Sequence, residues 1–132
     1  MANDKSAARP LSPHLQIYRP MLTMMMSIMH RITGVGLYFG IVLLVWWLTA
    51  ASVSESYFEF VQGFLGHWFG RLLLFGFTWA LIHHALGGLR HLLWDTGRGF
   101  DLTLIEWLAR GNLAGSIVLT LLLWIIGYGV MA

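Results

Sequence analysis

Three long stretches without a charged residue, separated by shorter polar segments, organise this sequence of 132 residues. They cover residues 32–54, 72–89 and 111–132. At about 1.5 Å of rise per residue, helices of these lengths measure about 27 to 35 Å, which is comparable with the roughly 30 Å hydrocarbon core of a bilayer. The pattern therefore predicts an all-α membrane protein with three transmembrane helices.

The polar residues between these stretches set the expected ends of the helices. The first helix is expected to start upstream of its uncharged part, because the residues from Leu22 to Arg31 continue at helical spacing. The N-terminal segment, 1–20, contains three prolines and is expected to be extended. The chain is then a single membrane-anchor domain, with helices over about 22–50, 67–94 and 112–131 and loops over about 51–66 and 95–111.

Composition supports a membrane protein and excludes several other classes. The chain is 58% hydrophobic and 11% charged, whereas soluble domains contain about 25% charged residues. It has no cysteine, so it cannot hold an iron–sulfur cluster or a disulfide by itself. Its eight lysines and arginines are scattered rather than gathered into a basic patch, so no nucleic-acid partner is expected.

The distribution of these cations predicts the orientation in the membrane. Seven of the eight lie before the first uncharged stretch or beside the second loop, and Arg71 alone lies on the other side. Cytoplasmic segments are enriched in lysine and arginine. We therefore expect the N-terminus and the second loop in the cytoplasm and the C-terminus in the periplasm, in a bacterial inner membrane.

Glycines in the first helix suggest a packing face. Gly34, Gly36 and Gly40 lie close together, and Gly36 and Gly40 have the spacing at which helices approach closely in membranes. The alternative is that glycine is simply more frequent in transmembrane helices than in soluble ones.

The most informative polar segment is HHALGGLRHLLWD, at 83–95. On a helix, steps of four and three residues place His84, Gly88 and His91 on one face. Imidazoles at membrane depth are costly, so they usually face a bundle interior and mark a site. The paired glycines leave room for a flat, bulky group near the backbone. This face is therefore expected to bind a haem.

His84 is the candidate axial ligand of the haem iron. It lies about 9 Å below the charge of Arg90, whereas His30 adjoins Arg31 near the same membrane border. By this comparison His30 is too shallow to be the second axial ligand and is better placed, with Arg31, for a haem propionate. The second ligand would then come from another chain. Alternatively, His84 only bonds a neighbouring helix, and His83, about 100° away on the helix, is structural.

A second candidate site lies near the start of the first helix. Ser27 and Arg31 are four residues apart, so both can face one pocket at the cytoplasmic edge of the membrane. A hydroxyl and a guanidinium there could hold the carbonyl oxygen of a quinone. The alternative is that Arg31 only extends to the membrane surface and Ser27 only packs.

Two motifs resemble those of the cytochrome b membrane-anchor subunit of succinate dehydrogenase, of the proteobacterial and mitochondrial type. The first is RPLSPHLQIYRP at 9–20, followed by SIMHRITG at 27–34. The second is HALGGLRHLLWD at 84–95, which is similar to the haem-ligand segment of that family. The resemblance covers essentially the whole chain.

The resemblance implies a four-subunit succinate:quinone oxidoreductase in which this subunit is not catalytic alone. A flavoprotein oxidises succinate, an iron–sulfur subunit relays the electrons, and two small membrane subunits bind ubiquinone and share one haem b. His84 would be this subunit's axial ligand to the haem iron. A histidine of the second anchor subunit would be the other, so the helices of both subunits would form one haem-binding bundle.

The resemblance also implies roles for three residues of the first helix. Ser27 and Arg31 match quinone-site positions, and His30 and Arg31 match positions near the haem propionates. Two other functions remain open: the anchor subunit of a quinol:fumarate reductase, and a structural anchor without haem.

Overall fold

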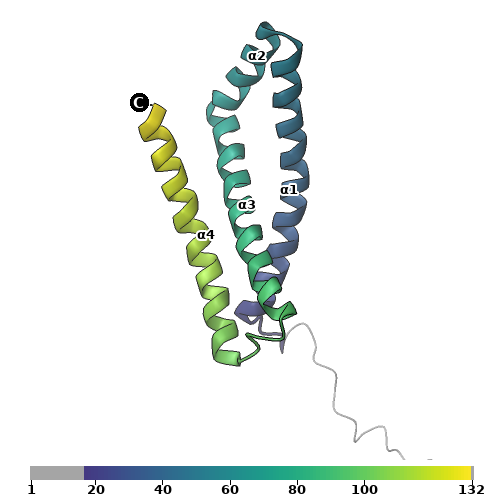
Figure 1. The fold of residues 1–132 in the computed structure, drawn as a ribbon, viewed down its shortest axis with the longest axis vertical. Helices are drawn as coiled ribbons and strands as arrows, with labels where there is room; N and C mark the ends of the chain where they lie inside the picture. Colours follow the sequence, from purple (N-terminus) through teal and green to yellow (C-terminus); the bar gives the residue numbers. More distant parts are fainter. Residues whose placement is uncertain (1–16, 132) are drawn as a thin grey trace, which may run out of the picture.

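The computed structural model describes residues 17–131, which form helices and short connections and contain no strand. The helices are α1 (Leu22–Val53), α2 (Glu55–Gly66), α3 (Trp68–Asp95) and α4 (Leu102–Met131) (Figure 1). Of these, α1, α3 and α4 are long and apolar enough to cross a membrane. The predicted all-α architecture with three candidate membrane-spanning helices is confirmed. The expected extended segment over 1–20 falls almost entirely outside the described residues.

The first predicted loop, 51–66, is largely a helix. Ser54 caps α2, because its hydroxyl accepts a hydrogen bond from the Tyr57 amide at 3.3 Å, and Glu55 in the first turn suits the positive end of the helix. Val61 and Leu65 are buried against Ala50 of α1. A polar segment with two glutamates was therefore wrongly interpreted as a loop, since its apolar face packs back onto the bundle.

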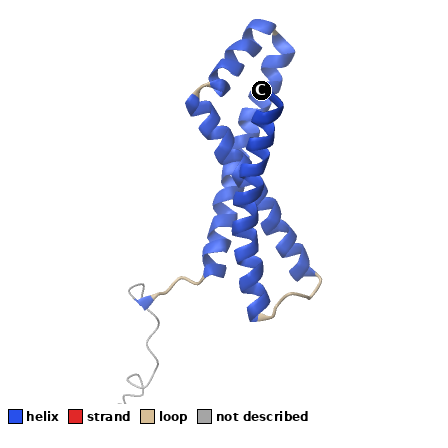
Figure 2. Cartoon of the chain, turned by 90° about the vertical axis from the view of Figure 1, so that its left-hand side faces the viewer, coloured by secondary structure: helices blue, strands red, loops and turns tan. Residues whose placement is uncertain are grey.

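The second predicted loop, 95–111, is shorter than expected because α4 begins at Leu102. The carboxylate of Asp101 accepts a hydrogen bond from the Leu104 amide at 3.1 Å, which caps the helix. The short connection from α3 to α4 contains Gly97 and Gly99 with φ of +74° and +82°, a region that favours glycine. Helix and connection can be followed in Figure 2.

In the arrangement of the membrane-spanning helices, α3 lies between α1 and α4 (Figure 1). A Cβ at Gly40 of α1 would overlap the ring of Phe77 on α3, and a Cβ at Gly34 would lie 3.1 Å from the His84 ring. A Cβ at Gly36 would meet nothing within 4 Å. The close approach of α1 to α3 therefore depends on Gly34 and Gly40, whereas Gly36 meets no other helix of the described residues and its role in packing stays a prediction.

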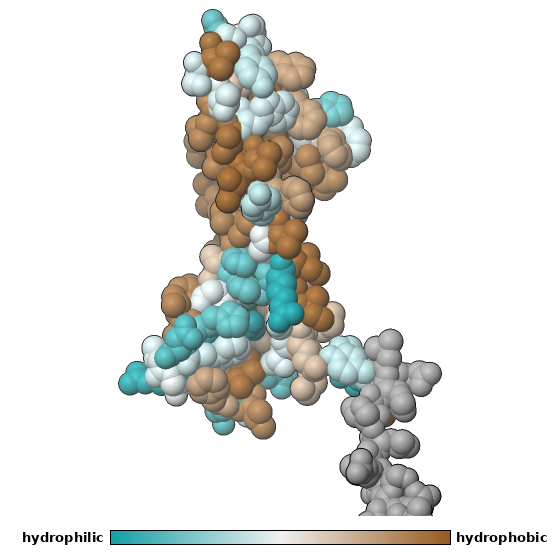
Figure 3. All heavy atoms as spheres, turned by 90° about the vertical axis from the view of Figure 1, so that its right-hand side faces the viewer, coloured by the Kyte–Doolittle hydropathy of each residue, from teal (hydrophilic) through white to brown (hydrophobic). Residues whose placement is uncertain are grey.

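The interior of the described bundle contains several polar side chains. Thr33, His83, Ser116 and Thr120 are each at most 2% exposed. Most large apolar side chains instead lie on the outside, where lipid or further helices can cover them (Figure 3). Buried hydroxyl and imidazole groups thus contribute to joining the helices.

Candidate functional site

The imidazole of His84 projects from α3 toward α1. Its Nδ1 lies 3.1 Å from the main-chain oxygen of His30 and 3.3 Å from Oγ1 of Thr33. A carbonyl oxygen can only accept, so in this arrangement Nδ1 carries the hydrogen and Nε2 of the neutral ring keeps its lone pair. Within residues 17–131, no hydrogen bond engages Nε2. The ring is therefore held in a form that can donate a lone pair to a metal.

His84 cannot bind a free metal ion with neighbours from this part of the chain. Among the described residues, no group of three histidine, cysteine or acidic side chains is placed to hold a metal. A metal bound at Nε2 would need its other ligands from outside these residues. A metal held within a macrocycle meets this condition, because the macrocycle itself supplies most of the ligands.

The rings of His30 and His84 are stacked, with centroids 3.9 Å apart and an interplanar angle of 9°. Both residues therefore lie at the same level, and the expectation that His30 is much shallower than His84 is wrong. Neither arginine marks a common level, because α1 continues for more than two turns before Arg31 and Arg90 is buried within the bundle. His30 is still unsuited to be the opposite axial ligand, because a face-to-face stack leaves no room for a macrocycle between the rings.

The two adjacent glycines of α3 have different surroundings. A Cβ at Gly87 would lie 2.5 Å from Nδ1 of His30, whereas a Cβ at Gly88 would meet nothing within 4 Å. The absence of a side chain at Gly87 thus allows the imidazole of His30 to pack against the backbone of α3. Nδ1 of His30 is buried there and has no hydrogen-bond partner among the described residues. Gly88 leaves space beside His84 that this part of the chain does not fill.

His83 faces α4 rather than α1 and is 1% exposed. Its Nδ1 lies 3.1 Å from Oγ of Ser116 and 3.3 Å from Nδ2 of Asn112. The structure therefore separates the histidine doublet: His83 joins α3 to α4, and His84 is available at the α1 side. Sequence spacing predicted that the two side chains leave the helix in different directions, but it did not predict which neighbouring helix each one contacts.

A third histidine and an arginine complete the polar end of α3. The ring of His91 is exposed and lies 5.2 Å from that of His30. Arg90 is 6% exposed, with its guanidinium 5.0 Å from the Trp94 ring, and its Nε has no hydrogen-bond partner within 17–131. Viewed from the α1 side, hydrophilic residues gather over the lower part of α1 and α3 and interrupt an apolar surface (Figure 3).

Ser27 and Arg31 are both exposed on α1. Their spacing of one helical turn places them on one face, as the sequence predicted. Neither of them lines the cleft described next.

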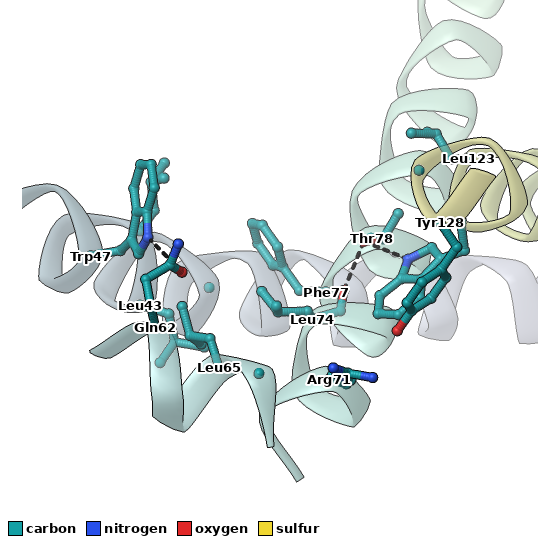
Figure 4. A pocket seen from close by; sticks show the side chains of 15 residues that line it. Leu43, Trp47, Gln62, Leu65, Arg71, Leu74, Phe77, Thr78, Leu123 and Tyr128 are labelled. Carbon is teal, nitrogen blue, oxygen red and sulfur yellow. Dashed lines mark hydrogen bonds between the residues drawn. The ribbon is translucent and has the colours of Figure 1, made fainter. Parts of the chain in front are cut away.

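An apolar cleft of about 630 Å³ lies toward the opposite end of the bundle and was missed by sequence reasoning (Figure 4). All four helices contribute to it, so no local pattern could have revealed it. The one available signal was Arg71, the single lysine or arginine that the described residues have at this end, which lines the cleft. The lining residues are Gly40, Leu43, Leu44, Trp47, Gln62, Leu65, Gly66, Arg71, Leu74, Phe77, Thr78, Leu123, Trp124, Gly127 and Tyr128.

Comparison with known proteins gives consistent matches along the chain. Residues 5–126 match the family described as succinate dehydrogenase/fumarate reductase transmembrane subunit. The succinate dehydrogenase cytochrome b556 subunit of Paracoccus denitrificans is 44% identical over 126 residues, which cover 96% of this chain and 97% of the relative. That of Rickettsia conorii is 37% identical, covering 89% and 91%. The mitochondrial cytochrome b560 subunit of Sus scrofa is 42% identical, covering 71% and 57%.

Proposed function

The chain belongs to the succinate dehydrogenase/fumarate reductase transmembrane subunit family, and from this premise we propose that it binds one haem b and forms part of a quinone-reduction site. It is a multi-pass membrane anchor of a succinate dehydrogenase complex. Its contribution to enzyme activity is that of a subunit, since succinate oxidation takes place elsewhere in such a complex.

The observation that carries the haem proposal is the contact of His84 Nδ1 with the main-chain oxygen of His30, at 3.1 Å. Metal-bound histidines usually donate their second ring N–H to a carbonyl or carboxylate, which fixes the tautomer and the ring orientation. The same contact leaves Nε2 free to bind the haem iron. Open space at Gly88, beside His84, is compatible with a flat group against α3. A bound haem b supplies one-electron chemistry, which the protein tunes through its ligand and surroundings.

The second axial ligand is proposed to be a histidine of a second anchor subunit. His30 is stacked on His84, and His83 is engaged with Ser116 on α4, so neither can reach the opposite face of the same haem. Helices of the second anchor subunit would therefore complete the haem-binding bundle. An iron–sulfur subunit and a flavoprotein subunit would deliver electrons from succinate.

His30 and Arg31 are proposed to hold the haem propionates. Nδ1 of His30 is buried against Gly87, where a carboxylate does not reach it, so the donor to a propionate oxygen would be the other ring nitrogen, Nε2. Arg31 is exposed and carries a permanent charge, so it can pair with a carboxylate.

Ser27 and Arg31 are proposed to bind ubiquinone. Both carry hydrogen-bond donors and share one exposed face of α1, so they can orient a quinone carbonyl oxygen. Arginine stays charged at any physiological pH, so Arg31 would stabilise negative charge on the oxygen without giving up its proton. Protons for quinol formation must then come from other groups.

A quinol:fumarate reductase anchor is the second candidate, because the family description names both enzymes. The relatives named above are succinate dehydrogenase subunits, which favours succinate oxidation. We further propose that the protein lies in the bacterial inner membrane with the N-terminus cytoplasmic, since seven of its eight lysines and arginines lie at that end.

The haem proposal is tested on the purified complex by the reduced-minus-oxidised spectrum, scaled to the amount of flavin. We expect His84→Ala to lower the b-type band more than tenfold and His67→Ala, at the other end of α3, to leave it unchanged. An unchanged band in an intact His84→Ala complex would refute the assignment. A wild-type complex with all subunits and no band would instead support the haem-free anchor.

The quinone proposal is tested by comparing two electron acceptors. Ser27→Ala and Arg31→Gln are expected to lower ubiquinone reduction while a soluble artificial acceptor still supports succinate oxidation. Equal loss of both activities would point to failed assembly. Full ubiquinone reduction in both variants would exclude these residues from the quinone site.

A further inference from the structure

The apolar cleft between the four helices has the composition of a lipid site. Its long walls come from α1 and α3 and from the last turns of α4, while α2 closes part of the outer end (Figure 4). Trp124 donates a hydrogen bond to Oγ1 of Thr78 at 3.3 Å, and Trp47 donates one to Oε1 of Gln62 at 3.2 Å, so both indoles are satisfied within the protein. The remaining lining is mostly Leu and Gly, with one Phe.

The cleft of about 630 Å³ is open at the surface of a bundle whose three long helices can cross a membrane, so the surrounding lipid has access to it. An unfilled void forfeits dispersion contacts along its whole lining, and an apolar lining offers water too few hydrogen-bond partners. The surrounding medium consists of acyl chains, which match this lining.

Arg71 adds a charge to the outer end of the cleft. It lies in the first turn of α3, where a membrane-spanning helix meets the headgroup region. Its guanidinium lies 5.9 Å from the Tyr128 ring, and no carboxylate pairs with it among the described residues. Glu55 and Glu59 of the neighbouring α2 do not line the cleft. An anionic group at the mouth would therefore complement an otherwise unbalanced cation.

We propose that this cleft binds one anionic phospholipid, with an acyl chain against the apolar lining and the phosphate at Arg71. The proposal concerns the end of the bundle away from the histidines and does not depend on haem or quinone binding. Bound in this way, the lipid would connect α4 to α1 and α2 at the end where α4 separates from them (Figure 1).

The chain offers matched variants for testing this site. Gly127 lines the cleft and Gly129 does not, and a Cβ at either position meets nothing within 4 Å. Gly127→Leu should therefore fill the cleft without a clash, and Gly129→Leu is its control on the same helix. Arg71→Gln removes the charge, Arg71→Lys keeps it, and Arg98→Gln is a control at the other end of the protein.

The experiment measures phosphatidylglycerol retained by the intact complex after delipidation, by native mass spectrometry and by titration of the lipid back into phosphatidylcholine nanodiscs. Gly127→Leu is expected to abolish retention of one phosphatidylglycerol, and Gly129→Leu to leave it unchanged. Arg71→Gln is expected to weaken binding about fivefold, from the roughly 1 kcal/mol contributed by one basic residue at a lipid surface. Arg71→Lys and Arg98→Gln should bind as wild type.

Three results would overturn the proposal. Retention that is the same in wild type and Gly127→Leu would show that the lipid binds elsewhere. If Arg71→Gln lowered the amount of co-purified quinone and left the amount of co-purified phospholipid unchanged, the cleft would be assigned to quinone. A photo-crosslinker at position 127 that reacts with another subunit rather than with lipid would show that a protein side chain fills the cleft.

Discussion

Gly87 of α3 lies directly against the imidazole of His30 of α1, and a methyl group at Gly87 would lie 2.5 Å from Nδ1 of that ring. The same imidazole is stacked on His84, whose Nδ1 contacts the His30 carbonyl oxygen. Because Gly87 has no side chain, α1 can approach α3 closely enough for His30 to stack on His84, the residue proposed to bind the haem iron. The contact connects helix packing with the orientation of a candidate ligand.

Gly87→Ala is expected to destabilise the bundle and to disturb the histidine pair. The added methyl group has to displace His30, and overpacking of this kind typically costs about 1–3 kcal/mol. Gly76→Ala is the matched control on the same helix, because a Cβ at Gly76 would meet nothing within 4 Å. Thermal unfolding of the complex in detergent measures the effect, and equal melting temperatures for the two variants would contradict it.

Gly40→Ala is expected to destabilise the contact between α1 and α3 by a similar amount, about 1–3 kcal/mol. The new methyl group would overlap the ring of Phe77, which must then move. Gly36→Ala should be tolerated, since nothing lies within 4 Å of its Cβ. If Gly36→Ala were the more damaging of the two, the side of α1 that faces α3 would be wrongly placed.

His83→Ala is expected to lower stability while leaving the haem band of the folded complex in place. It removes the contact between the His83 ring and Ser116 Oγ, at 3.1 Å, and leaves a cavity between α3 and α4. A double-mutant cycle with Ser116→Ala should give a coupling energy of about 0.6–2 kcal/mol, as found for hydrogen bonds between membrane helices. Zero coupling, or loss of the band before unfolding, would contradict the structural role.

Asp101→Ala is expected to destabilise the start of α4 by about 1 kcal/mol, because it removes the side-chain cap on the Leu104 amide. Asp101→Asn should retain most of the stability, since asparagine caps helices about as well as aspartate. Melting temperatures of the two variants, compared at neutral pH, check this. A loss as large in Asp101→Asn as in Asp101→Ala would indicate that charge, rather than capping, matters at this position.

Uncharged length predicted the three membrane-spanning helices because it directly reflects the cost of charge in a bilayer. Helical spacing upstream of Arg31 gave the start of α1, and the expected ranges 22–50 and 67–94 agree closely with α1 and α3. The start of the last helix was wrong, because α4 continues through Glu106 and Arg110, which pair with each other across one turn. The helix α2 was missed because it is short and carries glutamates, and its apolar side is buried only once α1 and α3 are in place.

Sequence spacing distinguished His84 from His83 but mistook the level of His30. Depth depends on where a helix begins relative to its neighbour, which charged residues mark only approximately. The cleft near Arg71 could not be derived from the sequence, because residues from four separate helices form it and Arg71 was the only signal of its position.

His30 and His84 are only half-buried between α1 and α3, and His91 beside them is exposed, which has a consequence for a newly synthesised copy of the protein. Until another subunit covers this face, polar imidazole groups are exposed to hydrocarbon. Membrane proteases and insertion chaperones can recognise a subunit with such exposed groups as unassembled. We expect the cellular level of this protein to follow that of its binding subunits, with surplus copies degraded soon after synthesis.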